Sequence, residues 1–195
     1  MKITTEEVRK LRNETGISIM QCKKALEESN GDLNKAIIIL RKHGSTVAGK
    51  KSGRELKAGV IQAYIHGTGD VGAMVELSCE TDFVAKNKEF ITLAYDIAMH
   101  VAATNPEFTN SNEISKDVMQ AAREVFEKEA AQQQKDLKEK IISGKLDMYF
   151  SDRILLEQKF IKNSEQTIND LIEIAVQRFG EKIEVTAFTR FSLRV

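Results

Sequence analysis

Apolar residues recur at helical spacing in three short runs at the N-terminal end of the chain, and polar or glycine residues separate the runs. Thr4 and Glu7 form a capping box ahead of the first run, and Gly16 is well placed to end it in a left-handed conformation. Asp32 can cap the third run, which Gly44 is expected to end. The pattern predicts a minimal bundle of three helices, each of about ten residues.

Between residues 45 and 57 the apolar periodicity disappears. Small and basic residues dominate this stretch, namely Gly49, Lys50, Lys51, Ser52, Gly53, Arg54 and Lys57. This composition is typical of a flexible, solvated connector. We therefore expect a domain boundary within it.

Two later regions alternate apolar and polar residues, which is the pattern of β-strands. Residues 60–65 and 71–77 flank the turn sequence Gly67-Thr68-Gly69-Asp70 and predict a β-hairpin. Residues 183–195 alternate in the same way, with Phe188 as the one exception. Because two strands alone are marginally stable, we expect the C-terminal stretch to add a third strand.

The sequence between these strands is helical in pattern. One apolar stripe precedes a stop signal at Pro106 and consists of Phe90, Ala94, Ile97 and Val101. Residues from about 115 to 143 are charge-rich with a narrow apolar line, which suits a projecting helical hairpin. A turn at 147–151, a short helix at 152–160 and an amphipathic helix at 167–179 are expected next. The fold class is therefore α+β, with a sheet packed on helices.

Composition places the chain among soluble globular proteins. It has 195 residues, of which 42% are hydrophobic and 30% charged. No stretch approaches the roughly 20 apolar residues that a membrane span needs. The N-terminal segment is charged and has no apolar signal core, so we expect a cytoplasmic protein without membrane contact.

Charge is unevenly distributed although the net charge is zero. Residues 1–57 carry 13 Lys and Arg against 7 Asp and Glu, and the rest of the chain carries 16 against 22. Nucleic-acid-binding proteins usually have a net basic domain, because affinity grows with each phosphate neutralised. The balance favours an acidic protein surface as the partner of the N-terminal part. Direct nucleic-acid binding is not expected, although a modest RNA contact stays open.

Motifs for metal, redox or nucleotide chemistry are incomplete. Cys22 and Cys79 have neither CxxC spacing nor a histidine at metal-ligand spacing. Three histidines lie on different predicted elements without a catalytic partner: His43, His66 and His100. The run from Gly44 to Lys50 comes close to a phosphate-binding loop, but Lys51 occupies the position that needs a Ser or Thr hydroxyl. We expect no cofactor, no bound metal and no enzymatic activity.

The segment of residues 81–87 (TDFVAKN) follows the second predicted strand directly. Thr81 can cap a turn that starts at Asp82, and Phe83 lies where the chain leaves the sheet. Two interpretations are open at this point. Periodicity alone favours Phe83 packing inward against the following helix, whereas the alternative places Phe83 on the surface as a wedge.

Residues 79–87 (CETDFVAKN) closely resemble the signature of the bacterial elongation factor Ts family, whose members exchange guanine nucleotides on elongation factor Tu. Further similar blocks follow the same order along nearly the whole chain: residues 11–16 with 20–26, residues 97–103 and residues 155–160. The length is similar to the short form of the family. Short members tend to pair as homodimers, so the resemblance also implies a homodimer.

The resemblance implies a fold as well. Residues 1–54 would be a three-helix domain like ubiquitin-associated domains, together with the basic linker. Residues 55–195 would be the core, with a three-stranded antiparallel sheet and a coiled-coil helical hairpin at about residues 111–162.

The resemblance implies that the chain binds elongation factor Tu in its GDP-bound and nucleotide-free states and promotes GDP release without covalent chemistry. The residues that would disturb the partner's magnesium site are Thr81, Asp82, Phe83 and Val84, with Phe83 as the wedge. Further partner contacts would come from Arg12, Ile19, Met20, Met99 and His100. Ile19 stands where a Met is common and Lys159 where a proline is more often found. The family pattern thus favours the exposed position for Phe83.

Two other functions are weighed against this one. A helical adaptor would bind ubiquitin-like modifiers through the N-terminal helices, and an RNA-binding accessory protein would use residues 42–57. Binding by the second would weaken steeply with salt. Neither function accounts for the block at residues 81–87.

Overall fold

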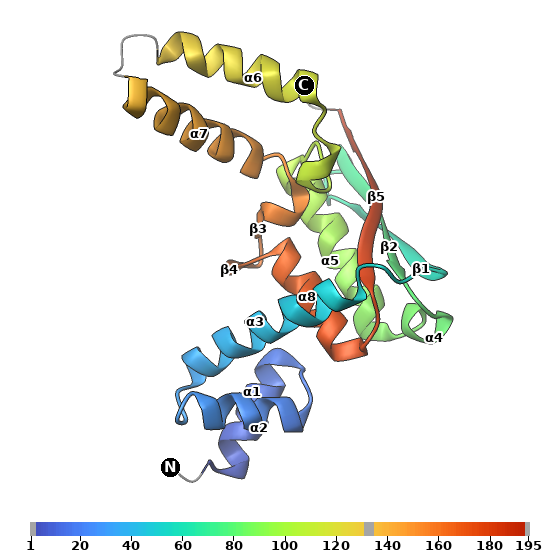
Figure 1. Ribbon diagram of the computed structural model, residues 1–195. Helices are drawn as coiled ribbons and strands as arrows, with labels where there is room; N and C mark the ends of the chain where they lie inside the picture. Colours follow the sequence, from blue (N-terminus) through green and yellow to red (C-terminus); the bar gives the residue numbers. More distant parts are fainter. Residues whose placement is uncertain (1–2, 131–134, 194–195) are drawn as a thin grey trace. The chain divides into compact units, whose positions relative to one another are not determined.

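The computed structural model describes residues 3–130 and 135–193. Figure 1 shows the elements in chain order. The chain forms two compact units. The first consists of Met1–Gln62, Glu76–Tyr95 and Asn169–Thr186, and the second of Ala63–Val75, Asp96–Ile168 and Ala187–Val195. Both the main sheet and helix α5 contribute residues to each unit.

Three helices begin the chain, as predicted: α1 (Thr5–Thr15), α2 (Ile19–Glu28) and α3 (Leu33–Lys51). The capping box is present, because Thr4 accepts from the N–H of Glu7 and the Glu7 carboxylate accepts from the N–H of Thr4. Gly16 ends α1 with φ 67°, in the left-handed region.

Helix α3 does not end at Gly44 but continues to Lys51, so the prediction of a connector from residue 45 is wrong. Gly44 lies within α3 and its Cα faces α8, where an added Cβ would be 3.2 Å from Oε1 of Gln177. This glycine therefore allows close packing and is not a stop signal. The domain boundary at residue 54 and the likeness to ubiquitin-associated domains stay predictions.

The main sheet is three-stranded and antiparallel, as predicted, in the order β1-β2-β5. Its strands are β1 (Ala58–Ile65), β2 (Val71–Cys79) and β5 (Ile183–Ser192). Along β5 the alternation shifts by one residue, because Thr186 and Ala187 are both exposed. A one-residue shift moves all later side chains to the opposite face. Ile183 and Val185 are therefore buried, whereas Phe191 is exposed.

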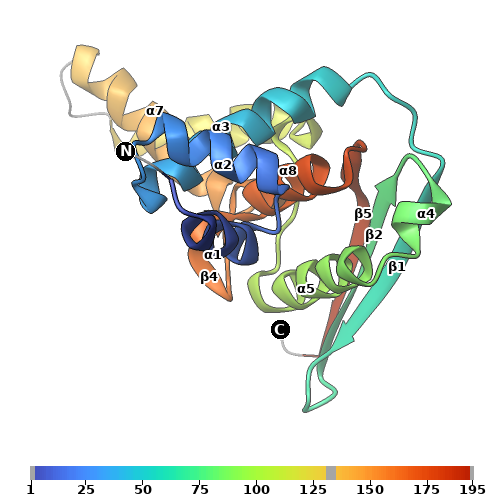
Figure 2. The ribbon, with the colours of Figure 1, turned by 90° about the horizontal axis from the view of Figure 1, so that it is seen from below.

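The helices that follow β2 match the predicted stripe and stop signal. A short helix, α4 (Asp82–Ala85), comes at the end of β2 and leads into α5 (Lys88–Thr104), as Figure 2 shows. In the first unit, Phe90 of α5 is fully buried and meets Phe179 edge to face at 6.1 Å between ring centroids. Helix α8 (Ile168–Phe179) also matches its prediction and is followed by Gly180 with φ 72°.

The predicted helical hairpin is present in the second unit as α6 (Lys116–Glu129) and α7 (Lys135–Ser151), which run side by side in Figure 1. A 3-10 turn, η1 (Ser111–Glu113), precedes them. A buried cluster joins the two helices to the chain that follows them: Ala130, Ile142, Leu146, Phe150 and Ile154. The described part of the hairpin thus has its own apolar core.

The turn predicted at residues 147–151 and the helix predicted at 152–160 are both wrong. Helix α7 continues through Gly144 to Ser151. The chain then forms a 3-10 turn, η2 (Leu155–Glu157), and a small antiparallel sheet of β3 (Lys159–Phe160) and β4 (Asn163–Thr167). No helix among the described residues is both long and apolar enough to cross a membrane.

Candidate functional site

The segment 81–87 forms helix α4 and the short link to α5. Thr81 stands at the N-cap position of α4 with extended backbone, as predicted, but its side chain does not cap the helix. The Thr81 hydroxyl donates instead to Oε1 of Glu181 at 2.6 Å. At the other end, Oδ1 of Asn87 accepts from the N–H of Glu89 at 2.8 Å and so caps the start of α5.

Phe83 projects to the surface, with 81% of the residue exposed. The interpretation that Phe83 packs inward is therefore wrong. Val84, the next residue, is 3% exposed and fixes α4 to the core of the first unit. A single helical turn thus presents the Phe83 ring to solvent, while the buried side chain of Val84 anchors the turn.

Asp82 lies beside Phe83 and is also exposed. Its carboxylate accepts a hydrogen bond from the Lys86 ammonium at 2.7 Å, one helical turn later. The hydrogen bond and the charge of Lys86 lower the pKa of Asp82, so the carboxylate is ionised at neutral pH. A negative group and its counter-charge therefore lie next to the exposed ring.

Two acidic residues that the sequence analysis did not identify hold the start of α4. The Glu181 carboxylate accepts from the N–H of Glu80 at 3.1 Å and from the N–H of Thr81 at 3.0 Å, besides the Thr81 hydroxyl. The Glu80 carboxylate in turn accepts from the N–H of Lys182 at 2.6 Å and from Arg54. Glu181 lies about 100 positions after Glu80 and Thr81 in the sequence, so no local sequence pattern indicates these contacts.

Cys79 also contacts this segment. It is fully buried, and its thiol donates to the carbonyl oxygen of Thr81 at 3.2 Å. Burial, with the charge of Glu181 after it, raises the pKa of Cys79. The thiol therefore stays protonated and acts as a donor, and Cys22 is likewise a free, buried thiol.

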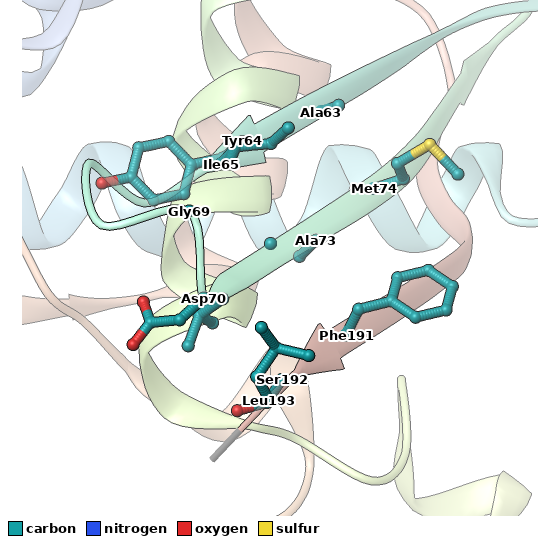
Figure 3. A pocket seen from close by; sticks show the side chains of 12 residues that line it. Ala63, Tyr64, Ile65, Gly69, Asp70, Ala73, Met74, Phe191, Ser192 and Leu193 are labelled. Carbon is teal, nitrogen blue, oxygen red and sulfur yellow. The ribbon is translucent and has the colours of Figure 1, made fainter.

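An exposed apolar patch covers the outer face of the sheet in the second unit. We call it the outer sheet patch and define it by Ile65, Met74, Phe191 and Leu193. Figure 3 shows these side chains around a hollow of about 460 Å³. Phe191 is 68% and Leu193 83% exposed, because the shift in β5 turns them away from the core.

Met99 and His100 lie next to each other on α5, in the second unit, but differ in exposure. Met99 is half-buried and lines a hollow of about 500 Å³ with Tyr64 and Arg190. His100 is fully buried, so it does not present a surface contact as the family pattern implied.

The bonding of His100 explains its position. Its Nδ1 accepts from the N–H of Ile161 at 3.4 Å, so Nε2 carries the proton and donates to Oε1 of Gln158 at 2.9 Å. Burial lowers the pKa of His100, and the ring is neutral at pH 7. Thr104 donates to the same Gln158 oxygen at 2.8 Å, so His100, Gln158 and Thr104 form one polar network.

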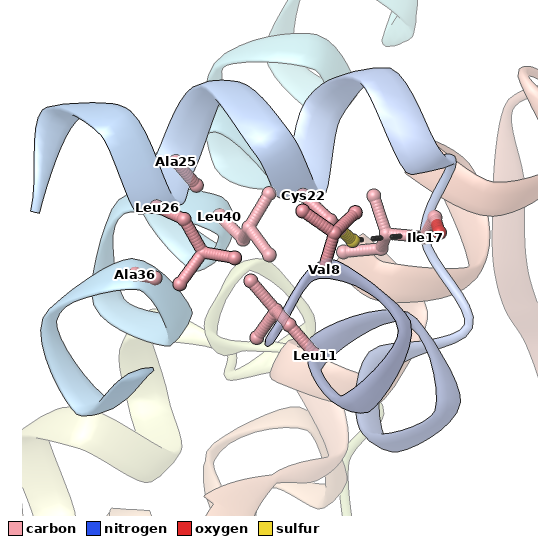
Figure 4. Close-up of a cluster of buried hydrophobic side chains, with 8 residues drawn as sticks. All are labelled: Val8, Leu11, Ile17, Cys22, Ala25, Leu26, Ala36 and Leu40. Atoms are coloured by element: carbon pink, nitrogen blue, oxygen red, sulfur yellow. Dashed lines mark hydrogen bonds between the residues drawn. The ribbon is translucent and has the colours of Figure 1, made fainter. Parts of the chain in front are cut away.

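The remaining predicted contacts lie on the N-terminal helices. The bundle closes over a buried apolar cluster that Figure 4 shows: Val8, Leu11, Ile17, Cys22, Ala25, Leu26, Ala36 and Leu40. Ile19 and Met20, in the first turn of α2, lie outside this cluster and are exposed, as is Arg12 on α1. The structure therefore leaves all three side chains accessible.

The described parts of the chain contain no metal-ligand cluster. Among these residues no three His, Cys, Asp or Glu side chains come together in a way that could hold a metal ion. The segment 81–87 presents an exposed aromatic ring and a carboxylate on a helical turn that Val84 and Glu181 hold in place.

Comparison with known proteins identifies the family. Residues 46–194 match the family model described as "Elongation factor TS". The chain is 47% identical over 194 residues to elongation factor Ts of Thermodesulfovibrio yellowstonii, covering 99% of this chain and 97% of that protein. It is 45% identical to the Carboxydothermus hydrogenoformans protein of the same name, covering 98% and 89%, and 44% identical to that of Fervidobacterium nodosum, covering 99% of each. The chain therefore belongs to the elongation factor Ts family.

Proposed function

We propose that this chain is a guanine-nucleotide exchange factor for elongation factor Tu in translation elongation. The observation that carries the proposal is the exposed ring of Phe83 on an anchored helical turn. Membership of the elongation factor Ts family supports it. The action requires binding alone, because it makes and breaks no covalent bond.

The mechanism follows from how a GTPase holds its nucleotide. The nucleotide is held mainly by magnesium and by the loop around the phosphates, so a partner that displaces either one speeds nucleotide release. Magnesium requires nearly ideal octahedral geometry, and small shifts of its ligands are costly. Phe83 supplies a rigid ring that can be inserted beside the magnesium site, Asp82 supplies a carboxylate next to it, and Thr81 and Val84 hold the turn.

The other predicted contacts divide into two groups. Ile19 and Met20 are exposed apolar side chains that suit docking on the GTPase domain, with Arg12 as a charged contact. Met99 is the accessible member of the pair on α5. His100, the other member of the pair, is fully buried and bonded to Gln158.

Linkage sets a condition on this mechanism. If the factor lowers the affinity of elongation factor Tu for GDP, then GDP lowers the affinity for the factor by the same ratio. Nucleotide and factor therefore compete without sharing a site. The factor binds the GDP complex, forms the nucleotide-free complex, and leaves when GTP binds.

Release of labelled GDP from purified elongation factor Tu tests the proposal. The chain is expected to accelerate release at millimolar magnesium and to add little in EDTA, where the magnesium site is already empty. A helical adaptor or an RNA-binding protein would accelerate release in neither condition. Equal acceleration with and without magnesium would contradict the magnesium-site mechanism while leaving the exchange activity intact.

A homodimer is part of the proposal, and the outer sheet patch is its most suitable interface. Exposed apolar patches of this kind usually mark association sites. Two copies facing each other through this patch would cover Phe191 and Leu193 on both sides. Sedimentation at micromolar concentration is expected to give twice the chain mass for the natural chain and the single mass for Phe191→Asp. The matched control, Ile38→Asp, replaces an exposed residue on α3 and should leave the dimer intact. A monomeric natural chain would exclude this pairing.

A further inference from the structure

We propose that Glu181 is a positioning residue for Phe83, an inference that rests on the proposed exchange function. Glu181 follows Gly180, at the turn between α8 and β5. We call its three contacts, with the N–H of Glu80, the N–H of Thr81 and the Thr81 hydroxyl, the Glu181 clamp. The clamp joins the end of β2 to a turn about 100 positions later in the chain.

Hydrogen bonds between the two segments are made by a carboxylate from each side. While Glu181 accepts from the backbone of Glu80, the Glu80 carboxylate accepts from the backbone of Lys182 at 2.6 Å. The N–H of Lys182, and Arg54 after it, lower the pKa of Glu80, so this carboxylate remains an acceptor at neutral pH. The two neighbouring chain segments therefore hold each other by reciprocal hydrogen bonds, all within the first unit.

The clamp leaves Thr81 little freedom. Its N–H and hydroxyl are bound to Glu181, and its carbonyl oxygen accepts from the Cys79 thiol at 3.2 Å and from the N–H of Ala85 at 3.2 Å. Thr81 is the N-cap residue of α4, so its orientation sets the axis of that helix. Phe83 comes two residues later, and its direction of projection follows from this axis.

Helix α4 needs such support because it is only four residues long. A single helical turn is not stable by itself, since its nucleation costs more than its one or two hydrogen bonds return. Val84 anchors the inner side of α4, and the Glu181 clamp fixes its start. With the clamp weakened, Val84 would still keep α4 attached, but the ring of Phe83 would sample several directions.

The chemistry requires a carboxylate at position 181. Oε1 accepts from the Thr81 hydroxyl, and Oε2 accepts from both backbone N–H groups. A glutamine amide has one accepting oxygen and a donating NH₂ group. Whichever way it turns, the NH₂ group of Glu181→Gln faces at least one donor, so part of the clamp is lost without a change of shape.

The test measures stimulated GDP release as a function of factor concentration, so that the maximal rate and the half-saturating concentration are separated. Glu181→Gln is expected to lower the maximal rate about tenfold and to change the half-saturating concentration by less than about threefold, because orientation and not docking is impaired. The matched control Glu184→Gln removes a carboxylate three residues later that pairs with Lys182 and not with Thr81. It should keep the maximal rate within about twofold.

A second pair of variants addresses the partner of the clamp. Thr81→Val removes the hydroxyl at nearly constant shape and is expected to lower the maximal rate, whereas Thr81→Ser keeps the hydroxyl and should retain it. A maximal rate within twofold of the natural chain for both Glu181→Gln and Thr81→Val would overturn the proposal. An effect on the half-saturating concentration alone would overturn it as well.

Amide hydrogen exchange in the isolated chain separates this proposal from the exchange function. The amides of residues 81–85 are expected to exchange at least about tenfold faster in Glu181→Gln than in the natural chain or in Glu184→Gln. Unchanged exchange at these amides would refute the clamp, whatever happens to GDP release. A natural chain that fails to accelerate GDP release would instead refute the exchange function.

Discussion

Truncation of Phe83 to alanine removes the exposed ring while leaving its support in place. Full burial of a phenylalanine side chain is worth about 1.5–3 kcal/mol. Phe83 is 81% exposed in the free chain, so most of this free energy is still available for contact with a partner. A contribution of about 2 kcal/mol corresponds to a roughly 30-fold effect on a rate or an equilibrium.

The same exposure predicts that the substitution hardly affects the chain itself. Exposed substitutions usually change the free energy of unfolding by less than about 0.5 kcal/mol. If the ring acts beside the magnesium site, its contribution is made mainly in the state that loses GDP. Phe83→Ala should therefore lower the maximal rate of stimulated GDP release by about 10- to 30-fold and weaken the complex by less.

Stopped-flow release of a fluorescent GDP analogue, at several factor concentrations, measures both quantities. Ile38→Ala is the matched control, since Ile38 is another exposed apolar residue of the first unit outside the segment 81–87. Thermal unfolding of both variants checks that the fold is kept. A maximal rate for Phe83→Ala within twofold of the natural chain would refute the wedge mechanism.

Two further predictions concern stability. Burial keeps the folded-state pKa of His100 below 6.5, so the unfolded chain binds more protons and the stabilising contribution of neutral His100 is lost as pH falls below about 6.5. The melting temperature should therefore drop more between pH 7.5 and 5.5 for the natural chain than for His100→Gln. Equal drops for the two proteins would contradict this. In Gly16→Ala, the alanine must adopt the left-handed conformation, and its Cβ overlaps the Arg178 guanidinium, which donates to the Thr15 carbonyl. The substitution should therefore lower the free energy of unfolding, measured in urea, by about 2–3 kcal/mol. The control Gly67→Ala, where the added Cβ enters open space, should change it little, and equal effects would refute the argument.

Local sequence signals predicted much of the fold because the structures they specify are local. The capping box at Thr4 and the left-handed glycine at position 16 each involve residues within one helical turn. The hairpin β1-β2 and the stop of α5 before Pro106 follow from short-range periodicity and turn chemistry. In each case the partners that satisfy the backbone lie a few positions apart.

The errors arose where distant segments decide the structure. Gly44 looks like a stop signal, but contact with α8 makes it a packing position inside α3. The shift in β5 between Thr186 and Ala187 places Phe191 on the outer face, whereas unbroken alternation would have placed it on the same face as Ile183 and Val185. The chain after α7 reads as helical, yet it forms a turn and a small sheet instead. No local pattern contains this information.

The candidate site shows the same division. Its exposed residues could be named from the segment 81–87, and the resemblance gave the correct exposed position for Phe83. The support could not be predicted, because Glu181 and Arg54 come from distant parts of the sequence. The burial of His100 was also missed, since a residue at the border of an apolar stripe can face either side.

Most positions of the segment 81–87 have a structural reason. Thr81 fixes the start of α4, Val84 anchors its inner side, and Asn87 caps α5, while Asp82 and Lys86 pair across one turn. Because the backbone is held at both ends, little conformational entropy remains to be lost when the ring of Phe83 enters a partner. Ordering a flexible loop would reduce the free energy available for binding. On a rigid support, the free energy of the proposed ring insertion would be left for displacing the groups around the partner's magnesium ion.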